Sequence, residues 1–105
     1  MRLLQKIFIF FLLLTLPLSV NSAEPEVLYL WQISSGQVWE SYGDENVQQK
    51  YEGITSNGEP NGKGILSFPD GKRVTGEWKN GNEWNTDHFN NKGKLIGRTA
   101  KGKYI

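Results

Sequence analysis

Pairs of glycines that stand five residues apart recur along the second half of the chain. The three pairs are Gly53 and Gly58, Gly76 and Gly81, and Gly97 and Gly102. The second pair follows the first after 23 residues, and the third follows the second after 21 residues. Periods of roughly 20–50 residues are typical of proteins built from stacked repeats, in which each unit buries its apolar face only against its neighbours. The spacing therefore predicts an array of small repeats.

Each repeat contains the signals of a β-hairpin. Asn57-Gly58 and Asn80-Gly81 accept the positive φ angles that tight hairpin turns require. Pro69-Asp70-Gly71 marks a further turn, because proline fixes φ at the first corner, aspartate bonds the local backbone and glycine takes the last corner. Turn signals at intervals of about 11–13 residues leave no room for a helix of ordinary length. We therefore predict an all-β chain that folds as an elongated antiparallel meander of stacked hairpins.

Strand alternation predicts where the core lies, because residues at alternate positions of a strand share a face. The sets that share a face are Gly62, Gly64, Leu66 and Phe68 on one strand, and Val74, Gly76 and Trp78 on the next. A glycine leaves a gap in which a neighbour's aromatic ring can lie against the backbone. We expect one core face in which aromatic rings fill these gaps, with two or three of the four tryptophans among them.

The first 23 residues have the pattern of a secretory signal peptide. Arg2 and Lys6 give a positive start, and residues 7–18 form an uncharged, largely apolar run. A bilayer-spanning helix needs roughly 20 apolar residues, so this run is short for a membrane anchor. Small residues then favour cleavage after Ser22 or Ala23. We predict a signal-peptide helix and export to the periplasm or the secreted space, with an uncleaved anchor as the alternative.

The predicted mature chain is small and its charge is unevenly distributed. Cleavage after Ala23 leaves residues 24–105, which suffice for one small domain, and the absence of cysteine excludes disulfides. The formal net charge of +1 becomes −1 when the two bases of the signal peptide are removed. Residues 24–59 carry seven acids and one base, whereas residues 60–105 carry nine bases and four acids. This asymmetry either steers a partner or a lipid headgroup to one end or lets neighbouring repeats attract one another.

The repeat region resembles the MORN repeat family. Residues 51–71 (YEGITSNGEPNGKGILSFPDG) follow the family pattern over its whole length, and residues 74–81 (VTGEWKNG) supply a second, partial copy. The positions that carry the resemblance are Tyr51, Gly53, Gly58, Gly62, Gly64, Phe68, Pro69, Asp70, Gly71, Gly76, Trp78 and Gly81. The sequence departs from the pattern at Thr55, where an aromatic residue is usual, and at Val74, which replaces the first tyrosine.

The resemblance implies a single antiparallel sheet of stacked hairpins that serves as a scaffold, a dimerisation module or a lipid-associated element. It implies no catalytic residue. We divide the mature chain into an N-terminal capping β segment (24–50), MORN-like repeats (51–85) and a degenerate C-terminal capping repeat (86–105). Caps are expected because a repeat array needs terminal units to cover its ends.

The sequence offers little catalytic or metal-binding chemistry. His88 is the single histidine, and its neighbour Asp87 points to the opposite face of any strand that contains both. One histidine without cysteine does not build an ordinary zinc site. The acidic stretch around Asp44 lacks the alternating ligand spacing of a calcium loop. We therefore expect no enzyme activity, no metal and no cofactor, and we interpret His88 as a surface or cap residue.

These features favour an exported interaction module that binds a protein partner or itself. The alternative is a binder of an envelope glycan or an anionic lipid, through exposed aromatic rings or the basic C-terminal stretch. Trp84 lies in a polar setting and is the best candidate for an exposed ring, although a structural role is favoured over a binding role for it. The basic candidates for interaction are Lys92, Lys94, Arg98, Lys101 and Lys103. No nucleic-acid partner is expected.

Overall fold

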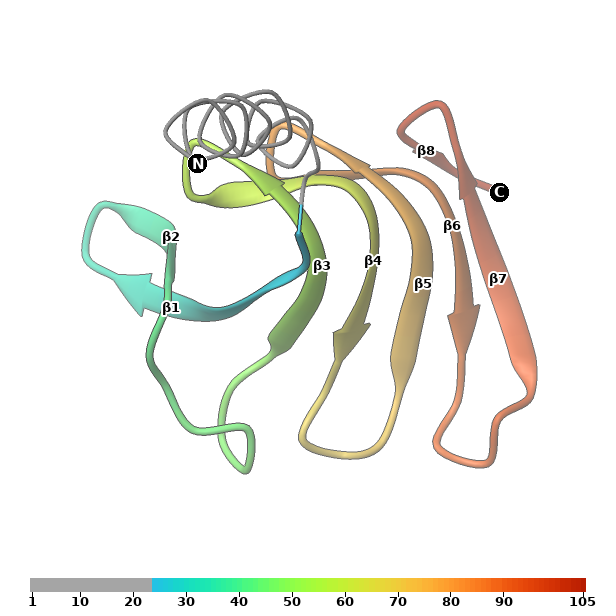
Figure 1. Ribbon diagram of the computed structural model, residues 1–105. Coiled ribbons are helices and arrows are strands. Elements are labelled where there is room, and N and C mark those ends of the chain that lie inside the picture. Colours follow the sequence, from blue (N-terminus) through green and yellow to red (C-terminus); the bar gives the residue numbers. More distant parts are fainter. Residues whose placement is uncertain (1–23) are drawn as a thin grey trace, which may run out of the picture.

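The computed structural model describes residues 24–105, which form one antiparallel sheet of eight strands. Figure 1 shows a curved sheet, with β1 and β2 at one side and β7 and β8 at the other. The strands are β1 (Glu26–Ile33), β2 (Gly36–Glu40), β3 (Lys50–Ser56), β4 (Glu59–Ser67), β5 (Arg73–Lys79), β6 (Asn82–Phe89), β7 (Leu95–Ala100) and β8 (Lys103–Tyr104). The all-β prediction is confirmed for this part of the chain, whereas the predicted signal-peptide helix lies outside it. No helix with the length and apolar character to cross a membrane occurs among residues 24–105.

The strand order is a simple meander from β3 to β8 and departs from one at the N-terminal end. The order across the sheet is β2-β1-β3-β4-β5-β6-β7-β8, so β1 rather than β2 pairs with β3. Pairing with β3 sets Leu28 opposite Tyr51 and leaves Leu28 only 4% exposed. Residues 41–49 return past β1 and are held there, because the Leu30 amide donates to the Gln49 carbonyl at 3.1 Å. The predicted pure meander is therefore wrong for β1 and β2.

Three hairpins close through the same two-residue turn, in which both φ angles are positive. The turns are Asn57-Gly58 (φ 54° and 76°), Asn80-Gly81 (52° and 84°) and Lys101-Gly102 (49° and 83°). Turns of this kind match the twist of the flanking strands, and they favour asparagine followed by glycine. The repeated glycine spacing in the sequence thus corresponds to the same hairpin turn in the structure, and the predicted tight turns are confirmed.

One face of the sheet carries the apolar core, and we call it the core face. Its buried residues are Leu28, Tyr51, Leu66, Val74 and Trp78, with Trp39 and Phe68 packed against them. The rings of Tyr51 and Trp78 meet edge to face with centroids 5.3 Å apart. The Tyr51 ring also covers Gly64, where a side chain would overlap it. The prediction of a one-sided core with aromatic rings in glycine gaps is confirmed here.

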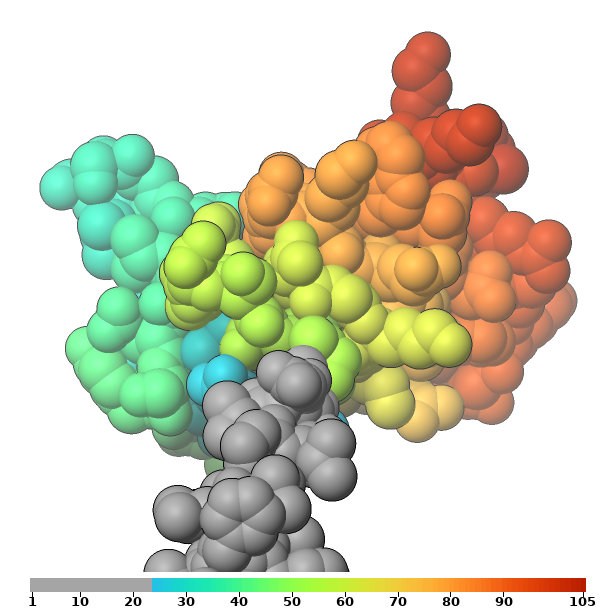
Figure 2. All heavy atoms as spheres, turned by 45° about the horizontal axis from the view of Figure 1, so that its top comes forward, coloured from blue at the N-terminus to red at the C-terminus, as the bar shows by residue number. Residues whose placement is uncertain are grey.

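Successive hairpins are tied together at their turns by a repeated pair of hydrogen bonds. The Asn80 amide donates to Asn61 Oδ1 at 3.0 Å, and the Gly81 amide donates to the Pro60 carbonyl at 2.8 Å. One hairpin further on, the Lys101 amide donates to Asn85 Oδ1 at 3.0 Å, and the Gly102 amide donates to the Trp84 carbonyl at 2.9 Å. Figure 2 looks onto this end of the sheet, where the yellow-green, orange and red hairpins lie side by side. The Asn80-Gly81 and Lys101-Gly102 turns are therefore each anchored on the hairpin before them.

The boundary predicted between the repeats (51–85) and the C-terminal segment (86–105) does not coincide with the end of a strand. Residues 24–50 supply β1 and β2, and residues 86–105 supply β7, β8 and the second half of β6. The proposed boundary between residues 85 and 86 falls inside β6 (Asn82–Phe89). The repeats and the C-terminal segment therefore share a strand and one continuous sheet.

Candidate binding surfaces

The five basic candidates do not form a single patch. Lys92 and Lys94 lie in the turn between β6 and β7, whereas Lys101 lies in the turn at the other end of β7. Arg98 points to the face opposite the core, where its Nε lies 3.1 Å from Asp87 Oδ1. Lys103 lies on the edge strand β8. These five residues all lie on or beside β7 and β8, but they do not come together in one binding site.

Trp84 is not the exposed ring that the sequence predicts. Its side chain is half-buried, and the Lys79 ammonium lies 4.4 Å from the centre of its ring. The register explains this position, because β6 shifts between the pairs Glu77–Asn85 and Trp78–Glu83 and leaves Trp84 as the extra residue. The Trp84 ring also borders Gly102 in the neighbouring hairpin. A polar sequence setting gave no sign of this packing between hairpins.

The two edges of the sheet carry opposite charge. Residues 24–49, which contain β1 and β2, have five acidic and no basic side chains. Residues 90–105, which contain β7 and β8, have five basic and no acidic side chains. Within residues 24–105, β2 and β8 each have a neighbour on one side only. Both outer strands therefore present backbone groups for pairing, and Figure 1 places them at opposite sides of the sheet.

A polar cluster continues the core face beyond the apolar core, with Glu83 and His88 at its centre. His88 Nε2 lies 2.6 Å from Glu83 Oε1 and 3.2 Å from Thr99 Oγ1. Glu83 Oε1 also accepts the hydroxyl protons of Thr86 at 2.6 Å and Thr99 at 3.1 Å. Thr86 and Thr99 are paired across β6 and β7 and are both buried. Three donors thus converge on one carboxylate oxygen.

This cluster lacks the geometry of a hydrolytic triad. In a triad, one ring nitrogen of histidine contacts the nucleophile and the other contacts the acid. Here Glu83 and Thr99 both contact Nε2 of His88. The Thr99 hydroxyl already donates to Glu83, and the residue is only 8% exposed. The arrangement fixes the position of the Glu83 carboxylate and is poorly suited to activating a nucleophile.

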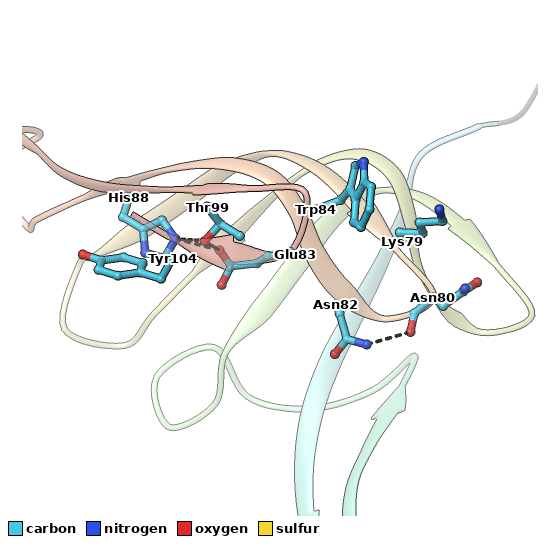
Figure 3. A pocket seen from close by; sticks show the side chains of 9 residues that line it. Lys79, Asn80, Asn82, Glu83, Trp84, His88, Thr99 and Tyr104 are labelled. Atoms are coloured by element: carbon cyan, nitrogen blue, oxygen red, sulfur yellow. Dashed lines mark hydrogen bonds and ion pairs between the residues drawn. The ribbon is translucent and has the colours of Figure 1, made fainter.

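A hollow of about 620 Å³ opens beside this cluster, and we call it the polar hollow. The β5–β6 hairpin lines it with Lys79, Asn80, Asn82, Glu83, Trp84 and His88, and the β7–β8 hairpin adds Thr99, Gly102 and Tyr104. Figure 3 shows Glu83, His88, Thr99 and Tyr104 close together, with Trp84 beside Lys79 further along. The rings of His88 and Tyr104 meet edge to face at 5.3 Å. His88 therefore belongs to a built polar site, and its interpretation as a plain surface or cap residue is incomplete.

A second, more apolar hollow of about 790 Å³ lies beside β1 at the acidic side of the sheet. Trp31, Tyr42 and Val47 line it, and the last two are 61% and 72% exposed. Trp31 Nε1 donates to the Tyr42 carbonyl at 2.9 Å, and the two rings lie 5.4 Å apart. Exposed aromatic and aliphatic side chains of this kind are typical of protein-binding surfaces. The acidic edge thus carries apolar groups next to its charges.

Comparison with protein-family models matches residues 51–73 to the MORN repeat. These residues are a MORN repeat. The match confirms the resemblance found in the sequence, and the repeat comprises β3 from Tyr51 onward, all of β4 and the turn into β5. Searches of curated proteins and of solved structures found no match to the chain. A MORN repeat indicates a module for binding or scaffolding, and this one contributes Tyr51 and Leu66 to the buried core described above.

Proposed function

We propose that the chain is an exported, non-enzymatic MORN-repeat module that binds a second copy of itself through the edges of its sheet. Another protein with a basic edge strand is the alternative partner. The observation that carries the proposal is the opposite charge of the two unpaired edges, with five acids in residues 24–49 and five bases in residues 90–105. We place this function in the periplasm or secreted space, because the first residues have the pattern of a signal peptide.

The backbone and side-chain groups of both outer strands, β2 and β8, are suited to pairing with another strand. An exposed edge strand presents amide and carbonyl groups that another strand can satisfy, which gives affinity with little dependence on side chains. The opposite charges help to set the register of the two strands and raise the rate at which two copies associate, because complementary potentials steer association. Exposed apolar side chains lie near each edge, Tyr42 on the acidic side and Tyr104 and Ile105 on the basic side.

A contact between unlike edges has a geometric consequence. The acidic edge of one copy meets the basic edge of the next, so every assembly keeps one free acidic edge and one free basic edge at its ends. Such heterologous contacts continue into open chains unless the rotation closes a ring. The expected assemblies therefore grow with protein concentration rather than stopping at a dimer.

Sedimentation of the exported protein at several concentrations and salt levels tests the proposal. We expect oligomers at low salt whose association weakens as salt rises to about 0.5 M, because exposed charges are screened within a few ångströms there. N-terminal sequencing of the same sample shows whether cleavage occurs near Ser22 or Ala23. A protein that stays monomeric at every concentration and at low salt contradicts self-association. Capture of a basic partner from the native envelope then supports the alternative.

A further inference from the structure

We propose that the polar hollow is a binding site for a neutral sugar unit of a glycan. This inference rests on the Glu83 cluster, which lies away from the edge strand, and it shares only Tyr104 with the proposed edge contact. Its three supports are the fixed carboxylate of Glu83, the balanced charge of the hollow and the exposed ring of Tyr104.

One oxygen of the Glu83 carboxylate holds the group in place, and the other oxygen is available to accept hydrogen bonds from a ligand. Oε1 takes the three donors from Thr86, His88 and Thr99, and no partner of Oε2 is found within residues 24–105. The side chain is 30% exposed and lines the hollow. A carboxylate accepts strong hydrogen bonds from hydroxyl groups, and prior fixation lowers the entropy cost of forming them. Oε2 is thus a preorganised acceptor for a ligand with hydroxyl groups.

The remaining lining favours a ligand that is polar and carries no net charge. Lys79 and Glu83 are one cation and one anion, and the lining contains no aliphatic side chain of the Val, Leu or Ile type. The Lys79 ammonium lies over the Trp84 ring, where it opposes the approach of a cationic ligand. Glu83 opposes an anionic ligand in the same way. The amides of Asn80 and Asn82 add both donors and acceptors, which suit a polyol.

Tyr104 gives the hollow an aromatic wall. The residue is 65% exposed, and its ring is positioned by the edge-to-face contact with His88. It also lies over Gly97, where any side chain would overlap it. An aromatic ring packs against the C–H face of a sugar while polar groups fix the hydroxyls, and a volume of about 620 Å³ lies within the usual range of small-ligand sites.

Titration of the ¹⁵N-labelled mature protein with chitopentaose, cellopentaose and maltopentaose tests the inference. We work at about 0.5 M salt, where edge association is screened but a neutral sugar site is not. At least one sugar should shift the Trp84 indole and the backbone amides of Glu83, His88 and Tyr104. Glu83→Gln should weaken that binding about tenfold or more, because it replaces a charged acceptor. Glu77→Gln, on the opposite face of the neighbouring strand, should leave it unchanged.

A second variant guards against misfolding of the first. Tyr104→Leu keeps an apolar side chain but lacks the ring, and it leaves the Glu83 hydrogen bonds in place, so binding should weaken about fivefold with an unchanged spectrum elsewhere. The inference is overturned if none of the three sugars shifts these residues at millimolar concentration. It is also overturned if binding is equal in the Glu83→Gln, Tyr104→Leu and unmodified proteins. Neither result depends on whether the edges pair, so the two proposals fail separately.

Discussion

The phenol ring of Tyr51 occupies the space that a side chain at Gly64 would need. A Cβ at Gly64 would overlap two ring carbons and the hydroxyl oxygen of Tyr51, and Tyr51 itself is fully buried. The φ angle of Gly64 is not among the positive ones, so glycine is required there for space and not for backbone conformation. Gly53, directly opposite on β3, is equally crowded by the backbone of Gly64. The MORN repeat thus depends on pairing a buried ring with a missing side chain.

We expect Gly64→Ala to destabilise the protein by about 2–4 kcal/mol, because overpacking forces the Tyr51 ring or the strand to move. The free energy of unfolding, measured by urea denaturation, gives the value. Gly93→Ala is the matched control, since Gly93 has no atom within 4 Å of its Cβ position and a φ of 81°. It should cost only about 1 kcal/mol of backbone strain. Equal losses in the two variants would contradict the steric role of Gly64.

The hydroxyl of Tyr51 links stability to pH. Burial raises the pKa of Tyr51 from 10.0 to about 12. As the pH rises, the Tyr51 hydroxyl therefore loses its proton in the unfolded chain before it does so in the folded protein. The contribution of this hydroxyl to the free energy of unfolding is complete below pH 10 and declines as the pH rises toward 12. Tyr51→Phe removes the titrating group and the 2.7 Å hydrogen bond to the Ile54 carbonyl, at a cost of about 1 kcal/mol at neutral pH. Urea denaturation across this pH range should show a narrowing difference between the two proteins, and a constant difference would contradict the assignment.

The core and the turns were predictable because their signals are local. Asn80-Gly81 requires positive φ angles whatever surrounds it, and alternation sets Val74 and Trp78 on one face without knowledge of the partner strand. The pairing of β1 with β3 was not predictable in this way. It depends on which strand brings an apolar residue beside Tyr51, and Leu28 does so from 23 residues away.

The polar hollow was missed because its lining comes from four strands, β5 to β8. Glu83, His88 and Thr99 are up to 16 residues apart and come together through the register of β6 with β5 and β7. Thr86 and His88 do alternate on one strand, which is a weak signal of a shared face. Trp84 was misjudged for the same reason, since its half-burial comes from Lys79 and from the next hairpin.

The tie between neighbouring turns gives a prediction about local opening. Asn85→Ala removes the acceptor of the Lys101 amide and should cost about 1 kcal/mol. Hydrogen exchange at Lys101 should then quicken, because the β7–β8 turn opens more often. Asn85→Asp keeps an oxygen that accepts from the Lys101 amide, so this amide should remain protected from hydrogen exchange. Asn61→Ala serves as the control in the preceding hairpin, where exchange should quicken at Asn80 and not at Lys101. Unchanged exchange at Lys101 in Asn85→Ala would show that the tie is not needed.

The third turn contains a residue that suits its conformation poorly. Lys101 has a φ of 49°, and asparagine adopts this region more readily than lysine. Lys101→Asn should therefore stabilise the protein by about 0.5 kcal/mol. Lys94→Asn removes the same charge at a position without a positive φ and should give no gain. Both are measured by thermal unfolding at high salt, and a gain in both variants would attribute the effect to charge instead.

Charge reversal at the basic edge tests the proposed association directly. Lys101→Glu with Lys103→Glu should abolish the low-salt oligomers, because like charges then face each other across the contact. A second protein with Glu40→Lys and Asp44→Lys on the acidic side should also fail to associate alone. Mixing the two variants should restore association in alternating order, since each acidic edge of the first variant then meets a basic edge of the second. Lys63→Glu with Arg73→Glu makes the same change in net charge within the middle strands and should associate like the unmodified protein. Sedimentation velocity separates these outcomes, and a mixture that remains monomeric would rule out pairing between unlike edges.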